Sequence, residues 1–202
     1  MARILIVGGG CRGRRFAERM VEQGHAVRAT TRGEAGRAAI EDTGAECWIG
    51  TPDRLATLRG ALANVTVACW MLACARGSEQ EIAPLHASRL QFFLSQAIDT
   101  TARGLIYDAW VVPGGAGGAR EEGSGGAGAA GVDAGDERAV ARRPTRAMLA
   151  EGAQVFRSLT ELNAIPAVVL GGEGELRGGD SEDAAWVAAA CDAVTALLGG
   201  DR

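Results

Sequence analysis

The sequence predicts an α/β protein with a parallel sheet, and three observations carry this prediction. An apolar run at residues 4–7 leads directly into a glycine-rich turn at 8–13. Apolar residues at helical spacing follow, and a second apolar run comes next, at 25–30. Short apolar runs and amphipathic stretches then alternate along much of the chain. This alternation is typical of parallel strands joined by crossover helices.

The remaining elements follow from their local patterns. Strands are expected at 4–7, 25–30, 46–49, 64–70, 104–107 and 165–170. Helices are expected from the turn to Gly24, over 34–43, from Pro52 through Leu62, over 81–100, from Pro144, and from 180 through 198. About six parallel strands with helices on both faces predict a three-layer Rossmann fold.

The turn after the first strand carries a cofactor-binding pattern. Gly8, Gly10 and Gly13 fit G-x-G-x-x-G between a strand and a helix. The first glycine allows a tight turn, the second lets the backbone approach a pyrophosphate, and the third lets helix and strand pack closely. Free N–H groups and the helix dipole then favour the phosphates. A dinucleotide is therefore expected here, and a glycine turn without a ligand is the alternative.

The end of the second strand bears on which dinucleotide is bound. NAD sites usually have an acid there, bonded to the ribose 2′-hydroxyl, whereas NADP sites usually have an arginine. This chain has Thr31 and Arg32, and Arg12 and Arg14 flank the last glycine. A guanidinium suits a phosphate dianion. NADP(H) is therefore favoured. NAD(H) stays open, because Glu34 lies just past the strand.

Composition limits the class of protein. The chain has 202 residues, and residues 1–202 are expected to form a single domain. Its contents of 47% hydrophobic and 23% charged residues are ordinary for a globular protein. A net charge of −4 gives no reason to expect nucleic acid. No apolar run approaches the roughly 20 residues of a membrane span. The first strand stands at the N-terminus, so no signal peptide is expected and a cytoplasmic location is predicted.

Two residue counts restrict the chemistry. All 21 basic residues are arginine, so mechanisms that need a lysine from this chain are excluded. The five cysteines have irregular spacing, and only two histidines are present, so reduced thiols and no metal centre are expected. Cys11 lies in the glycine turn and is a candidate cofactor contact.

A glycine-rich segment at 113–136 interrupts the alternation. It contains ten glycines and almost no large apolar side chains. Such a composition buries too little surface to offset its ordering entropy, so a flexible loop is expected. Because it follows the fifth strand, a lid over the ligand and an inert insertion are both open.

Three stretches carry a family resemblance: Ile4–Gly10, Gly50–Asp53 with the residues through Leu62, and the segment of small residues after Val67. They resemble the short-chain dehydrogenase/reductase superfamily, most closely its atypical NAD(P)-binding branch of epimerase-like and NmrA-like proteins. The likeness covers roughly residues 3–110. It implies that Thr51 lies near the adenine, where the family often has Asp. It also implies that the loop after Cys69, including Met71, lies near the nicotinamide.

The resemblance breaks down at the catalytic pair. Active family members use Tyr-x-x-x-Lys, in which the tyrosine exchanges the proton. The single tyrosine here is Tyr107, and Val111 stands four residues on. Tyr107 remains a candidate catalytic residue. The adjacent Asp108, at a carboxyl end of the sheet, is the second candidate, although its charge would raise the tyrosine pKa.

Two classes of function therefore remain. One is an atypical reductase that lacks the tyrosine–lysine pair and acts on an unknown small molecule. The other is a non-catalytic NADP(H)-binding redox sensor that reports to a partner protein. A homodimer is an open alternative in both.

Overall fold

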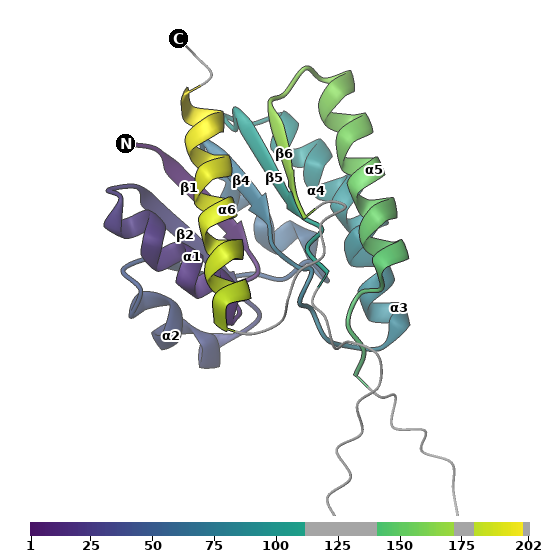
Figure 1. The fold of residues 1–202 in the computed structure, drawn as a ribbon, viewed down its shortest axis with the longest axis horizontal. Helices are drawn as coiled ribbons and strands as arrows, with labels where there is room; N and C mark the ends of the chain where they lie inside the picture. The colour runs from purple at the N-terminus through teal and green to yellow at the C-terminus, as the bar shows by residue number, and fades with distance from the viewer. Residues whose placement is uncertain (112–140, 172–179, 200–202) are drawn as a thin grey trace, which may run out of the picture.

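The computed structural model describes residues 1–111, 141–171 and 180–199. Its centre is a six-stranded, all-parallel sheet in the order β3-β2-β1-β4-β5-β6 (Figure 1). The strands are β1 (Arg3–Val7), β2 (Ala26–Thr31), β3 (Glu46–Ile49), β4 (Val67–Trp70), β5 (Gly104–Asp108) and β6 (Ala167–Leu170). The predicted six-stranded parallel sheet is confirmed. The chain turns from one half of the sheet to the other between β1 and β4, where open α/β sheets bind their ligands.

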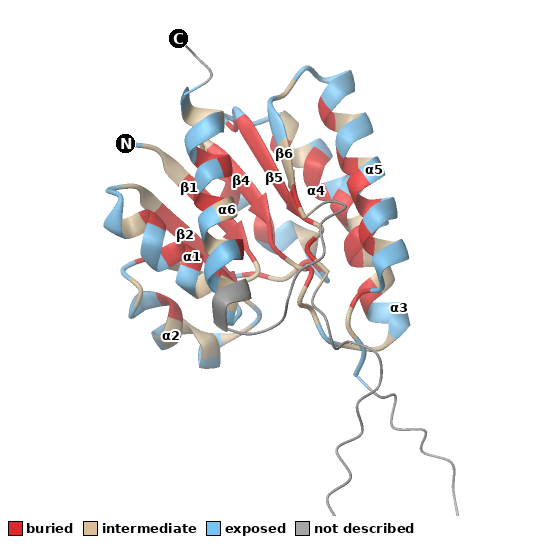
Figure 2. Cartoon of the chain, viewed as in Figure 1, coloured by how far each residue is buried: buried red, intermediate tan, exposed pale blue. Residues whose placement is uncertain are grey.

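Alternate side chains of β1 enter two separate cores. Ile4 and Ile6 pack in the cluster under helices α1 (Cys11–Glu22) and α6 (Asp180–Gly199). Leu5 and Val7 pack in the cluster under α4 (Ser88–Ile98) and α5 (Arg146–Leu162). Figure 2 shows the buried sheet between these two helical layers. The three-layer Rossmann fold is therefore confirmed, and β1 is buried on both faces.

The region after β3 differs from the predicted helix through Leu62. It forms two short 3-10 helices, η2 (Leu55–Leu58) and η3 (Gly60–Leu62). The Trp48 indole donates to the Thr57 carbonyl at 2.7 Å, and Arg28 donates to the Ala61 carbonyl at 2.6 Å. Because side chains of β2 and β3 take these carbonyls, a regular helical ladder does not form.

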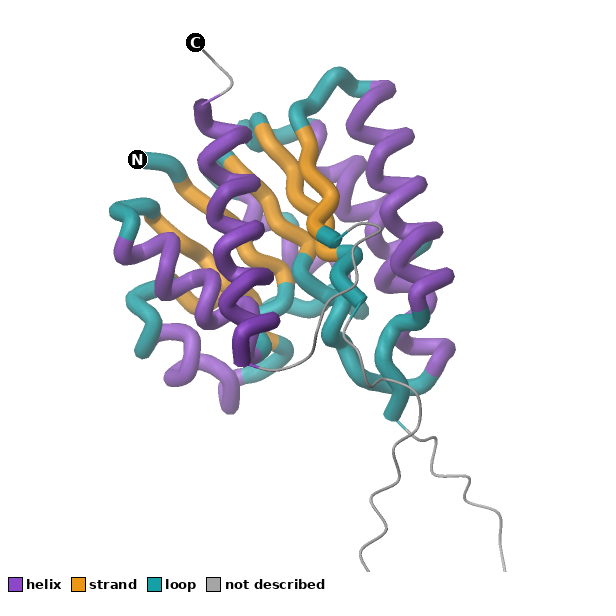
Figure 3. Tube along the Cα trace, viewed as in Figure 1, coloured by secondary structure: helices purple, strands orange, loops and turns teal. Residues whose placement is uncertain are grey.

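Two other predicted helices are subdivided. The 34–43 helix is η1 (Glu34–Gly36) followed by α2 (Arg37–Glu41). The 81–100 helix is α3 (Glu79–Ile82), η4 (Ala83–His86) and α4. A capping box of Ser78 and Glu81 starts α3 two residues early, and Ala87 leaves helical geometry at φ −131° and ψ −104°. The tube in Figure 3 follows these breaks.

The helices α5 and α6 agree with prediction in place and type. The Thr145 hydroxyl caps α5 by accepting from the Met148 N–H at 3.2 Å. The predicted glycine-rich loop at 113–136 lies outside the described residues. Among those that are described, no helix has the length and apolar character that crossing a bilayer requires.

Helix α5 approaches β5 closely at a glycine. The Phe156 ring stacks on Tyr107 with 5.6 Å between centroids. A Cβ on Gly152 would lie 2.1 Å from the Tyr107 hydroxyl and 2.9 Å from the His86 carbonyl oxygen. Both neighbours are buried, so neither has free space into which to move.

We expect Gly152→Ala to lower the free energy of unfolding by about 1–3 kcal/mol, because overpacking a core forces its neighbours to shift. Without the close contact, the substitution would instead raise the free energy of unfolding, because alanine stabilises a helix interior by about 1 kcal/mol relative to glycine. Denaturant unfolding measures the difference. Gly33→Ala, where a Cβ meets no atom within 4 Å, is the control and should change stability little. A stabilised Gly152→Ala variant would contradict the packing described here.

Candidate functional site

A cleft of about 460 Å³ runs across the carboxyl end of the sheet. The segments that line it follow the strands in spatial order: 50–53 after β3, 30–32 at the end of β2, 8–13 after β1, 71–76 after β4, and Asp108 at the end of β5. Trp186 of α6 and part of α3 and η4 complete the walls. Five strand ends therefore contribute to one elongated cleft, which suits an extended ligand.

The glycine turn brings backbone segments into contact at the middle of the cleft. Gly8 has φ +119°, and a Cβ there would lie 2.4 Å from the Met71 carbonyl oxygen. A Cβ on Gly13 would lie 2.1 Å from the Gly8 carbonyl oxygen. Only glycine fits these two positions. By contrast, a Cβ on Gly10 would meet no protein atom within 4 Å, so the space in front of it is open.

The first turn of α1 has the character of an anion site. Gly10 is the N-cap, with no side-chain cap and no acidic residue in the first turn. The backbone N–H groups of Cys11, Arg12 and Gly13 have no partner within the helix, because the first helical hydrogen bond is from Arg14 N to Gly10 O. Open space, free N–H groups and a positive helix end fit a pyrophosphate. The predicted glycine-turn residues thus fit the predicted group.

The β2 side of the cleft carries Thr31 and Arg32, two of the residues that the sequence assigned to a cofactor site. Arg32 forms no ion pair with any described residue. Its charge contributes to lowering the pKa of Glu81, which also lines the cleft. Glu34, the residue that kept NAD(H) open, does not line the cleft. It forms an ion pair with Arg37 instead. The end of β2 therefore presents Thr31 and Arg32 to the cleft, and not the Glu34 carboxylate.

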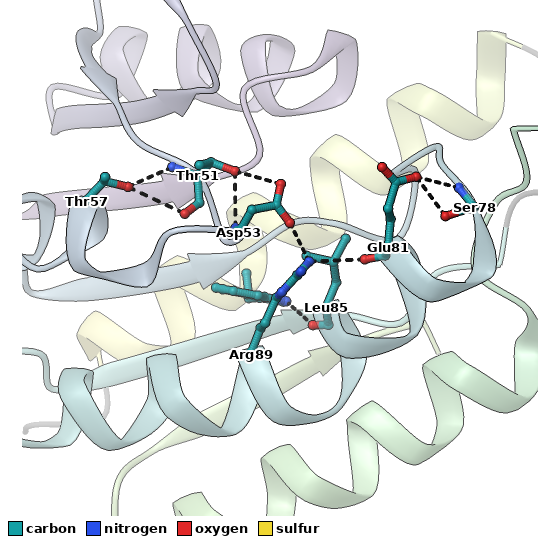
Figure 4. Close-up of polar contacts among 8 residues, drawn as sticks. Thr51, Asp53, Thr57, Ser78, Glu81, Leu85 and Arg89 are labelled. Atoms are coloured by element: carbon teal, nitrogen blue, oxygen red, sulfur yellow. Dashed lines mark hydrogen bonds and ion pairs between the residues drawn. The ribbon is translucent and has the colours of Figure 1, made fainter.

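A polar network fixes the wall beyond β3 (Figure 4). Thr51 and Asp53 are held in their turn by hydrogen bonds between the Thr51 hydroxyl and Asp53. The Asp53 carboxylate forms an ion pair with Arg89 of α4, and Arg89 also donates to the Glu81 carbonyl at 3.2 Å. Arg89 thereby ties the turn after β3 to α3. Thr51, the residue that the resemblance places near the adenine, lines the cleft.

Arg12 binds residues of the protein itself, whereas its position in the turn predicted a contact with the 2′-phosphate of a cofactor. Its Nε donates to Asp183 of α6 at 2.7 Å, and its guanidinium lies 5.8 Å from the Trp186 ring centre. Its Nη1 also lies 3.5 Å from the Cys74 sulfur. All three partners belong to the β4–β5 side. Arg12 lines the cleft but faces away from Arg32, so the structure does not group the two arginines.

Of the other residues that the sequence assigned to the cofactor site, some line the cleft and one does not. Cys11 and Met71 line the cleft, and Cys11 is exposed. Arg14 does not line it, and its guanidinium lies 3.6 Å from the Cys11 sulfur on the outer surface of α1. All five cysteines are free thiols, in agreement with prediction. Within the described ranges, no three His, Cys, Asp or Glu side chains gather as a metal site.

Asp108 lies buried at the end of the cleft beyond β4. Its Oδ1 accepts from the Trp186 indole N–H and from the Trp110 backbone N–H, each at 3.1 Å. Burial raises the pKa of the Asp108 carboxyl to about 6, while these hydrogen bonds and the charge of Arg12 lower it. A carboxyl with a pKa near neutrality, in a cleft, is a feature of functional sites.

Tyr107, the other predicted catalytic residue, does not reach the cleft. Its side chain is fully buried on the opposite face of β5, and its hydroxyl lies 2.8 Å from His86 Nδ1 and 3.4 Å from the Leu149 carbonyl. Burial raises the Tyr107 pKa and lowers that of His86 to about 4. His86 is a core residue that packs against Tyr107.

The sequence did not single out several residues of the cleft. These are Trp186, Asp183 and Arg89, together with the apolar wall formed by Leu72, Ile82 and Leu85. Trp186 and Asp183 lie more than 70 residues from their partners. The sequence predicted a helix over 180–198, but nothing in its pattern indicated that Trp186 reaches a carboxylate at the sheet edge.

Comparison with known proteins shows which solved structures share this fold. No family model matches the sequence, and no curated protein matches it. Solved structures do resemble the chain. The structure of gox2253 has a TM-score of 0.58 at 20% identity, over 84% of this chain and 50% of the other. A short-chain dehydrogenase/reductase superfamily protein from Agrobacterium tumefaciens, with bound NAD, has a TM-score of 0.57 at 18% identity, over 83% and 48%.

UDP-glucose 4-epimerase from Thermotoga maritima, solved with UDP-glucose, has a TM-score of 0.56 at 14% identity, over 83% of this chain and 54% of the other. The chain therefore has the fold of the short-chain dehydrogenase/reductase and epimerase proteins, as the resemblance implied. At these identities the likeness shows the fold alone. The chain spans about half the length of the solved structures it matches.

The raised pKa of Asp108 predicts a pH-dependent loss of stability. The pKa of an Asp in the unfolded chain is about 3.9, so the folded protein binds this proton more tightly than the unfolded chain does. The free energy of unfolding therefore falls as the pH rises from about 4 through 6. Asp108→Asn removes the penalty. We expect this variant to gain about 2–3 kcal/mol over the parent protein at pH 7.5, relative to their difference at pH 4. Urea unfolding at both pH values measures the gain. Asp192→Asn, at an exposed position, is the control. A pH-independent difference would contradict the buried, raised carboxyl.

Proposed function

We propose that this chain binds NADP(H) across the cleft and acts as an atypical reductase without a tyrosine–lysine pair. The observation that carries the binding proposal is the turn at Gly8–Gly13. Two of its glycines allow backbone contacts that no side chain permits, and the third, Gly10, faces open space beside free N–H groups. That arrangement suits a pyrophosphate, and the structural neighbour from Agrobacterium tumefaciens holds NAD.

The strand order supports one orientation of the ligand. With the pyrophosphate at the turn, the adenosine half extends toward the β2 and β3 ends, because the ribose partner lies at the end of β2. The nicotinamide half then extends toward β4 and β5. Thr51 and Pro52 would border the adenine, and Met71, Asp108 and Trp186 would border the nicotinamide.

Charge at the β2 end supports NADP(H) over NAD(H). Arg32 lines the cleft without an ion pair to any described residue, and Glu34 is engaged with Arg37. A 2′-phosphate at the end of β2 would therefore meet the Arg32 guanidinium instead of the Glu34 carboxylate. Arg12 and Arg14, which the sequence grouped with Arg32, do not support this role, because one pairs with Asp183 and the other does not line the cleft.

The reductase proposal rests on the nicotinamide end. A bound dinucleotide would supply the hydride, and a reductase also needs a source of the proton. Asp108 lines the cleft with a pKa near 6, which suits a group that gives and takes protons close to neutral pH. Met71, Leu72 and Trp186 make that end partly apolar, as a substrate pocket requires.

A non-catalytic redox sensor is the second candidate function. It is favoured by Tyr107, whose hydroxyl is committed to the core, and by the complete absence of lysine. Both candidates need the dinucleotide. They differ in whether NADPH is consumed when acceptors are offered, so absorbance at the NADPH band, followed over a panel of aldehydes, ketones and quinones, distinguishes them.

The first test is a fluorescence titration of the protein with NADPH and with NADH at one ionic strength. Tighter binding of NADPH supports the proposal. Binding of neither would refute both candidate functions.

Gly10→Ala is predicted to abolish the binding of both dinucleotides without loss of stability. Its φ of −69° is ordinary, and the new methyl group would stand in open space that the pyrophosphate needs. Thermal unfolding and NADPH titration measure the two effects. Gly13→Ala is the matched comparison. Its Cβ would collide with Gly8, so stability itself should fall, by about 1–3 kcal/mol. Unchanged NADPH affinity in a folded Gly10→Ala variant would refute the turn as the phosphate site.

Arg32→Ala is predicted to weaken NADPH binding by about tenfold to a hundredfold and to leave NADH binding nearly unchanged, since only NADPH carries the 2′-phosphate. Parallel titrations with both dinucleotides measure the ratio. Arg76→Ala, an arginine at the other end of the cleft, should leave this ratio as it is. Equal weakening of both dinucleotides by Arg32→Ala would refute the 2′-phosphate role.

A further inference from the structure

The Asp108 end of the cleft contains one carboxylate whose charge no ion pair with a described residue compensates. The nearby cation is Arg12, but its guanidinium is bound to Asp183 at 2.7 Å, and Asp183 is also bound by Arg15. The partners of Asp108 itself are two neutral N–H groups, from Trp110 and Trp186. When Asp108 is ionised, this end therefore carries a buried negative charge that is held by two neutral N–H donors and, without an ion pair, by the charge of Arg12.

The other groups around Asp108 do not cancel that charge. The Cys74 thiol, which lines the same end, is neutral at ordinary pH because burial raises its pKa. Tyr107 faces the other side of β5 and stays protonated. Arg143 acts on Cys74, and Arg76 is an exposed residue at the rim, where solvent screens its charge.

The two redox forms of a nicotinamide dinucleotide differ in charge at one place. The oxidised ring carries a positive charge and the reduced ring is neutral, whereas the adenosine and phosphate parts are the same. In the proposed orientation the ring lies toward β4 and β5, where Asp108 is buried. A charge in a poorly solvated site interacts more strongly with a neighbouring charge than it would in water.

We propose that Asp108 makes the cleft bind the oxidised dinucleotide more tightly than the reduced one, and that the preference increases with pH as this carboxyl ionises. The inference rests on the proposed binding of a dinucleotide. It does not require hydride transfer, and it holds for the reductase and for the sensor.

The sign of the pH effect follows from the proton on Asp108. The pKa of this carboxyl is about 6, so it is mostly neutral at pH 5 and mostly ionised at pH 7.5. The neutral acid does not distinguish a charged ring from a neutral one by charge. The carboxylate favours the cationic ring, and covering it with a neutral ring removes water without compensation. The ratio of the NADPH to the NADP⁺ dissociation constant should therefore rise with pH.

The test is calorimetric titration of the protein with NADP⁺ and with NADPH at pH 5 and at pH 7.5. We expect the ratio of the two dissociation constants to rise by about tenfold between these pH values. The 2′-phosphate also titrates near about pH 6, but both ligands carry it, so its effect cancels in the ratio. Asp108→Asn, which keeps an oxygen for the two N–H donors, should hold the ratio at its low-pH value throughout.

The outcomes separate this inference from the proposed function. If neither ligand binds the parent protein, dinucleotide binding fails and the inference fails with it. If both bind with a ratio that is constant in pH, or if Asp108→Asn keeps the parent's pH dependence, only the role of Asp108 is refuted. Asp53→Asn, at the adenine end, is the matched control. Any change that it causes in the two affinities should be the same for both ligands and should leave the pH dependence of their ratio intact, because Asp53 is remote from the ring in the proposed orientation.

Discussion

The close approach of β1 and α1 is the constraint on which the cleft depends. A Cβ on Gly13 would lie 2.1 Å from the Gly8 carbonyl oxygen, and a Cβ on Gly8 would lie 2.4 Å from that of Met71. Three backbone segments therefore meet with no side chain between them. This contact sets the first turn of α1 at the point where the strand order reverses. It thereby aims the free N–H groups of the helix into the cleft between β1 and β4.

Ion pairs within the protein decide which charges the cleft presents. At the β3 end, Asp53 forms an ion pair with Arg89, so the charged side chains of the cleft that have no ion pair with a described residue there are Arg32 and Glu81. At the β5 end, Arg12 and Arg15 share Asp183, and Asp108 accepts from neutral N–H groups. The cleft thus has an arginine without an ion pair near β2 and a carboxylate without an ion pair near β5. An oxidised NADP molecule has the complementary arrangement, with its 2′-phosphate at one end and its cationic ring at the other.

The sequence predicted the parts of this arrangement that depend on local patterns. The strands, the glycine turn and the first helix follow from residues that are close in the chain, and all three are confirmed. It did not indicate contacts between residues that are distant in the chain. The neighbours of Arg12 in the turn suggested a phosphate ligand, but gave no sign of its hydrogen bond to Asp183, which lies 171 residues away. The helix expected through Leu62 is broken by the side chains of Arg28 and Trp48 from two strands.

Strand geometry explains why the two adjacent catalytic candidates have different surroundings. Successive side chains of a strand point to opposite faces, so Tyr107 and Asp108 cannot share one environment. Tyr107 pairs in register with Trp70 and enters the core under α4 and α5, where its hydroxyl meets His86. Asp108 faces α6 and the cleft. Of the two candidates, Asp108 is therefore the one that borders the space in which a ligand would lie, whereas the Tyr107 hydroxyl is held in the core. This difference follows from the alternation of the strand and holds for either proposed function.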